Sequence, residues 1–94
     1  METITRHLRI EGRVQGVYYR ASMVDAARRL GIAGWVCNRA DGSVEALVQG
    51  APQAVQALVD WAHRGPERAQ VQAVHMTAVA DAPRHTGFEQ HATV

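Results

Sequence analysis

The chain has 94 residues, of which 47% are hydrophobic, and its formal net charge is +1. This length suits one domain over residues 1–94, the near-neutral charge makes nucleic acid an unexpected partner, and no apolar run is long enough to span a bilayer. The N-terminus also lacks the basic-then-apolar pattern of a signal peptide, so we expect a cytoplasmic protein without membrane contact.

The first predicted elements are a strand and a glycine-containing loop. Residues 3–11 alternate polar and apolar side chains, which predicts the strand. Residues 12–20 follow, and two glycines frame a turn that Arg20 closes. Glycine allows successive backbone N–H groups to converge on an anion, and a guanidinium matches phosphate oxygens. The loop therefore predicts a pocket for one phosphate-like group, although a plain connection with a solvated arginine remains the alternative.

A helix is predicted directly after this loop. Apolar side chains between residues 22 and 30 share one face at helical spacing. Ser22 and Asp25 resemble a capping box at the helix start, and Gly31 is a typical C-terminal stop. The positive end of this helix would face the same point as the loop, which favours an anion there.

Two strands joined by a hairpin follow the helix. Residues 32–39 and 44–49 alternate apolar and polar side chains, and the Asp41-Gly42 pair between them is a strong turn signal. In the first of these strands Trp35 and Cys37 share one face, while Val36 and Asn38 share the other. Asn38 stands near the strand end, where an asparagine can simply cap the strand.

The last third of the chain predicts a second helix and one or two further strands. The helix opens at residues 50–52 and ends before Gly65. Residues 70–79 predict a fourth strand with an irregularity between Ala73 and Val74, and residues 86–91 predict a short last strand. The buried stripe expected on the second helix consists of Val55, Leu58, Val59 and Ala62.

The predicted order of elements is β-α-β-β-α-β, with a possible short fifth strand. This order is typical of the α+β, ferredoxin-like sandwich, in which two helices cover one face of an antiparallel or mixed sheet. The fold hosts many functions, so the chemistry has to be argued from particular residues.

Three stretches of the chain stand in a distinctive order and spacing, namely Gly12-Arg13-Val14-Gln15-Gly16-Val17-x-Tyr19-Arg20, Leu30-Gly31-Ile32-x-Gly34-Trp35-Val36-x-Asn38 and Asp41-Gly42-Ser43-Val44-Glu45. Together they resemble the acylphosphatase family, and the resemblance covers nearly the whole chain. It implies the ferredoxin-like fold, hydrolysis of carboxyl-phosphate anhydrides without metal or cofactor, and two essential side chains, Arg20 and Asn38.

The chemistry that this resemblance implies needs few groups. The leaving carboxylate has an unperturbed pKa of about 4, so no general acid is required. The Arg20 guanidinium would bind two phosphoryl oxygens, and the Asn38 amide would orient a water that attacks phosphorus directly, with the substrate phosphate as the candidate base. We expect a monomer that takes a small acyl phosphate and also binds phosphate or sulfate. The backbone N–H groups expected to cradle the phosphoryl group belong to Gln15, Gly16, Val17, Tyr18, Tyr19 and Arg20.

Other candidate chemistries are weaker. The chain has no lysine, which excludes a lysine nucleophile, and its single cysteine, Cys37, excludes an internal disulfide and is expected to be a packed residue. Five histidines show no close metal-ligand spacing, so no metal site is predicted. Tyr18 and Tyr19 are expected in the pocket wall or the core. A non-catalytic anion-binding module is the main alternative function, and an RNA-binding sheet, which needs exposed aromatic residues and a basic surface, is a third.

Overall fold

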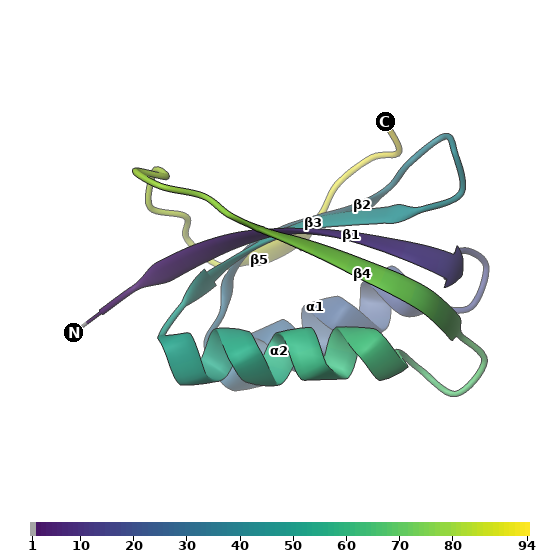
Figure 1. Cartoon of the computed structure of the whole chain (residues 1–94), viewed down its shortest axis with the longest axis horizontal. Helices are drawn as coiled ribbons and strands as arrows, with labels where there is room; N and C mark the ends of the chain where they lie inside the picture. Colours follow the sequence, from purple (N-terminus) through teal and green to yellow (C-terminus); the bar gives the residue numbers. More distant parts are fainter. Residues whose placement is uncertain (1) are drawn as a thin grey trace.

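The computed structural model describes residues 2–94. Within these residues five strands form one mixed sheet in the order β4-β1-β3-β2-β5, and two helices cover one face of it (Figure 1). All neighbouring strands are antiparallel except β5, which runs parallel to β2. The predicted ferredoxin-like α+β fold is confirmed. The elements are β1 (Ile4–Arg13), α1 (Tyr19–Leu30), β2 (Ala33–Asn38), β3 (Val44–Gly50), α2 (Pro52–Arg64), β4 (Gln70–Ala78) and β5 (Phe88–Gln90).

The hydrophobic core lies between the sheet and the two helices. Leu8 and Ile10 of β1 and Val36 of β2 point into it and are fully buried. Alternation along a strand places Asn38 on the same face as Val36, as predicted, and this face points toward the helices. The stripe predicted on α2 is also confirmed, because all four of its residues are buried.

Helix α1 begins three residues earlier than predicted, at Tyr19, and the predicted capping box is wrong. Its N-cap is Tyr18, in the left-handed conformation, and no side chain caps the helix. The first helical bond runs from the Ser22 N–H to the Tyr18 carbonyl oxygen, 3.0 Å away. The physical reason is that buried Tyr19 lies one turn before Met23 and extends the apolar stripe toward the N-terminus. Arg20 is consequently the second residue of the helix.

Gly12 belongs to β1 and not to the loop, which corrects the predicted two-glycine turn. Its φ is 126°, and a Cβ there would lie 2.1 Å from the Gln70 carbonyl oxygen, so the residue allows β1 and β4 to approach closely. The pairing register shifts beside it, and Gln72 is the extra residue on β4. The predicted irregularity in β4 therefore exists, but just before Ala73 and not after it. The other boundaries lie within two residues of the predicted ones.

Three connections meet at one end of the molecule. Figure 1 shows the β1–α1 loop, the β2–β3 hairpin and the α2–β4 turn at the same end of the sheet. The C-terminal segment continues beside β2, because the Val94 N–H donates to the Asn38 carbonyl oxygen at 3.0 Å and the Ala40 N–H donates to the Val94 carbonyl oxygen at 2.8 Å. The C-terminal segment therefore fixes the position of the Asn38 backbone through the hydrogen bond from the Val94 N–H.

Candidate active site

A cleft of about 500 Å³ opens at this end of the sheet. It is lined by the β1–α1 loop, the first turn of α1 and the end of β2. Val17 is the one predicted cradle residue that does not line the cleft, because its side chain is buried in the core. The structure brings the other predicted site residues together around the cleft, namely Gln15, Gly16, Tyr18, Tyr19, Arg20 and Asn38.

The loop has the backbone shape that an anion cradle needs. Gly16 and Tyr18 both adopt the left-handed conformation, with φ of 73° and 62°. Such alternation turns successive N–H groups toward one side of the chain. The first turn of α1 follows at once, carries no acidic residue, and presents N–H groups that precede the helix's own hydrogen bonds. The cleft therefore meets the electropositive end of α1.

Arg20 supplies a full positive charge to the same cleft. It lies in the first turn of α1, is half-buried, and forms no ion pair with any acidic residue among residues 2–94. An arginine that no carboxylate neutralises can give its planar fork of donors to a bound anion.

Asn38 carries an unsatisfied acceptor. It ends β2, and its side-chain Oδ1 is buried without a hydrogen-bond partner among the described residues. A buried acceptor without a partner costs about 1–3 kcal/mol, which native proteins seldom tolerate without a use. Asn38 also lines the cleft, so its amide group lies at the cleft wall.

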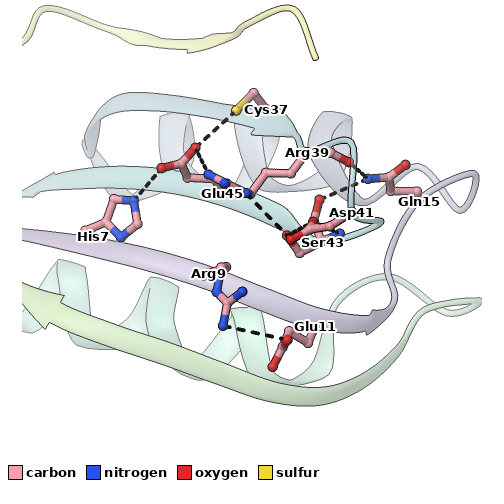
Figure 2. Close-up of polar contacts among 9 residues, drawn as sticks. All are labelled: His7, Arg9, Glu11, Gln15, Cys37, Arg39, Asp41, Ser43 and Glu45. Carbon is pink, nitrogen blue, oxygen red and sulfur yellow. Dashed lines mark hydrogen bonds and ion pairs between the residues drawn. The ribbon is translucent and has the colours of Figure 1, made fainter. Parts of the chain in front are cut away.

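The side chain of Gln15 has a contact that sequence reasoning missed. Its Nε2 donates to the carbonyl oxygens of Arg39 and Ser43, at 2.8 and 2.9 Å (Figure 2). These bonds tie the loop to the β2–β3 hairpin directly beside Asn38. No local signal could have revealed them, since both partners are backbone groups more than 20 residues away along the chain.

Tyr19 and Tyr18 have different surroundings, although they are neighbours. Tyr19 is buried, its hydroxyl donates to the Ala62 carbonyl oxygen at 2.7 Å, and its ring packs against Trp61. Burial raises the pKa of the Tyr19 phenol, so it stays neutral. Tyr18 is 81% exposed at the mouth of the cleft. The prediction of core or pocket wall is confirmed, because Tyr19 is buried in the core and also borders the cleft, while Tyr18 forms part of the cleft wall.

The opposite face of the sheet carries a polar network centred on Glu45. Its carboxylate binds His7 Nε2 at 2.6 Å and Arg39 Nη1 at 3.0 Å, and the Cys37 thiol lies 3.8 Å away (Figure 2). The hydrogen bond from His7 lowers the pKa of Glu45, and Arg39 adds to this effect against the cost of burial. Burial, followed by the nearby Glu45 charge, raises the pKa of the Cys37 thiol. Cys37 is a packed residue, as predicted, and the raised pKa favours its protonated form.

The histidines do not gather into a metal site. His7 and His75 each pair with a different glutamate, and His91 stacks on Trp35 with ring centroids 5.6 Å apart. Within residues 2–94 no group of three or more potential ligands could hold a metal ion. No helix in this part of the chain is long and apolar enough to cross a membrane.

The comparisons with known proteins place this chain in a class of hydrolases that act on acid anhydrides. The acylphosphatase family model matches residues 6–90, and the chain belongs to the acylphosphatase family.

Named relatives and solved structures agree with this assignment. An acylphosphatase of Acidovorax sp. (strain JS42) is 64% identical over an alignment that covers 98% of this chain and 94% of the relative. A relative from Thiobacillus denitrificans is 55% identical over 92% of this chain and 94% of its own length. The crystal structure of acylphosphatase from Bacillus subtilis matches with a TM-score of 0.91 at 32% identity, covering 94% of this chain and 98% of that one. The chain is accordingly a hydrolase of small-molecule acyl phosphates.

Replacing Gln15 with alanine should lower kcat/KM for benzoyl phosphate by roughly tenfold, because a loop released from the hairpin no longer holds its N–H groups in register with Asn38. Loss of the two hydrogen bonds should also lower the free energy of unfolding by about 1–2 kcal/mol. Steady-state kinetics and urea unfolding measure the two effects.

Gln53, an exposed glutamine of α2, provides the matched control. Its replacement with alanine should leave kcat/KM unchanged. Wild-type kinetics in the Gln15 variant would show that the tie to the hairpin is irrelevant to activity.

Proposed function

We propose that this enzyme hydrolyses acyl phosphates by direct attack of water on phosphorus, without a metal, a cofactor or a covalent enzyme intermediate. The observation that carries this proposal is that one cleft is lined by the amide of Asn38 and by Arg20, which forms no ion pair among residues 2–94. An amide at the wall of such a cleft can hold a water beside a cationic phosphoryl site.

The phosphoryl group needs positioning and charge stabilisation more than covalent chemistry. In the proposed complex the backbone N–H groups of residues 15–20 and the Arg20 guanidinium bind its oxygens. The end of α1 adds partial positive charge at the same place. These donors are set before the reaction and oppose the charge that develops as the acyl oxygen departs.

Water is the proposed nucleophile. The Asn38 amide holds this water by a hydrogen bond, which directs an oxygen lone pair toward phosphorus. The new oxygen–phosphorus bond forms while the bond from phosphorus to the acyl oxygen breaks, and the carboxylate leaves with the electron pair. One proton of the water passes to a phosphoryl oxygen, so neither a general acid nor a side-chain base is required.

Hydrolysis of benzoyl phosphate in H₂¹⁸O with excess EDTA tests this proposal. We expect undiminished turnover in the chelator, one ¹⁸O atom in the inorganic phosphate and none in the benzoate, measured by mass spectrometry. Rapid-quench kinetics should show no burst of benzoate ahead of phosphate. Label in the benzoate would place the attack at carbon, a burst would reveal a covalent phosphoenzyme, and inactivation by EDTA would reveal a metal requirement.

We also propose that phosphate and sulfate occupy the phosphoryl site as competitive inhibitors, since both resemble the group that the cradle would hold. The proposed unit is a single domain over residues 1–94 that acts as a monomer, because every residue proposed for the site comes from one copy of the chain. A cytoplasmic location suits the free thiol of Cys37, since cytosolic thiols stay reduced.

A further inference from the structure

A second arginine lines the same cleft and has no part in the proposed reaction. Arg68 lies in the turn between α2 and β4, and its side chain is exposed at the cleft. No carboxylate among residues 2–94 forms an ion pair with it. The residues that line the cleft include Arg20 and Arg68 but no aspartate or glutamate within the described chain.

The turn that carries Arg68 is anchored on the neighbour of Arg20. Gly65 sits so close to Tyr19 that a Cβ at this position would lie 2.7 Å from the tyrosine ring. The Tyr19 hydroxyl also holds the last turn of α2 through the Ala62 carbonyl oxygen. A hydrogen bond of 3.0 Å from the Ala69 N–H to the Pro66 carbonyl oxygen closes the turn itself. The backbone of Arg68 is thereby fixed relative to the first turn of α1.

The sheet order puts Arg68 and Asn38 on opposite sides of the loop. The loop continues from β1, and β4 and β2 lie on different sides of β1 in the order β4-β1-β3-β2. Asn38 ends β2, while Arg68 stands just before β4 (Figure 1). In an in-line displacement the attacking and leaving oxygens lie on opposite sides of phosphorus. In the proposed complex, a water held by Asn38 would direct the acyl group toward the side of Arg68.

The positive charge of Arg68 is not needed for the proposed phosphoryl contacts or for departure of the carboxylate. In the proposed complex the N–H groups, the end of α1 and Arg20 already face the phosphoryl group, and a carboxylate with a pKa of about 4 departs without help. We propose that Arg68 binds an anionic group on the acyl part of the substrate, so that the enzyme prefers acyl phosphates whose acyl chain bears a second carboxylate. This inference rests on the in-line attack proposed above.

Rigid aromatic substrates that differ in one charge test the proposal. Kinetics are measured with 4-carboxybenzoyl and 3-carboxybenzoyl phosphate, and with the corresponding methylbenzoyl phosphates, for the wild type and Arg68→Gln. We expect the variant to lose about five- to tenfold in kcat/KM for at least one carboxylated substrate, mainly through KM, and less than twofold for the methyl substrates. The difference should shrink as salt is added.

Arg29→Gln is the matched control, because it removes the same charge from an exposed position of α1 that does not line the cleft. It should leave the preference between substrates unchanged. An equal loss of kcat/KM on charged and uncharged substrates would mean that Arg68 contacts an atom common to both. Unchanged kcat/KM on all of them would mean that Arg68 does not contact the substrate. Either result overturns the inference about Arg68. The proposed attack on phosphorus is tested separately, and it is supported as long as ¹⁸O appears in the phosphate. Label in the carboxylate would instead overturn the proposed attack on phosphorus.

Discussion

Replacing Arg20 with glutamine should reduce kcat/KM for benzoyl phosphate by roughly 1000-fold, with KM raised and kcat lowered together. The proposed guanidinium contact is made to the phosphoryl group in the ground state and strengthens as charge shifts in the transition state, and removal of one such donor costs about 100- to 1000-fold or more. Steady-state kinetics give both parameters. Inhibition by inorganic phosphate should weaken in parallel, since the proposed anion site loses its only full charge from α1.

Folding should not obscure this result. Glutamine has a helix propensity close to that of arginine, and Arg20 forms no ion pair among residues 2–94 that the substitution would break. The thermal midpoint should therefore stay within a few degrees of the wild type. Arg29→Gln, which lies outside the cleft, should keep full activity. Normal phosphate inhibition and turnover in the Arg20 variant would remove this residue from the proposed site.

Replacing Asn38 with alanine should lower kcat by about 100- to 1000-fold while KM and the inhibition constant for phosphate change little. The proposed role of the amide is to hold water and not to bind the phosphoryl group, so the loss should appear in turnover. The free energy of unfolding should be unchanged or higher, because the variant no longer buries an oxygen without a partner.

This combination separates a functional role from a structural one. A residue kept only to end the strand would lose stability and not turnover when replaced. Asn38→Asp retains the shape and an acceptor but adds negative charge beside a phosphoryl dianion, so it should also be slow and should raise KM. Unimpaired turnover in the alanine variant would contradict the proposed water site.

Periodicity predicted the parts of the fold that local physics controls. The alternation of β1 and the 3.6-residue stripe of α2 each reflect one buried face, so the elements could be predicted from the chain itself. The start of α1 could not, because Tyr18 begins the helix from a left-handed conformation without a polar cap, and Tyr19 looked like part of the loop. The predicted helix start was Ser22, because serine is a common N-cap residue.

Some residues of the site could likewise be predicted from the sequence, and others could not. Arg20 and Asn38 stand out because each belongs to a motif with fixed local spacing, and the fold brings both to one cleft. The Gln15 side-chain bonds and the position of Arg68 arise from segments that meet only after folding. No residue close in sequence to Gln15 or Arg68 indicates these contacts. From the sequence alone, only a role for the backbone N–H of Gln15 could be predicted, and no role could be predicted for Arg68.

The two left-handed residues of the loop have a consequence for how substrate is bound. A non-glycine residue such as Tyr18 at φ 62° costs of order 1 kcal/mol or more, and the surrounding fold meets this cost when the chain folds. The directions of the amide groups are thus settled in advance. Association with an acyl phosphate would then order little backbone, and preorganisation of this kind leaves more of the interaction energy available for affinity and rate.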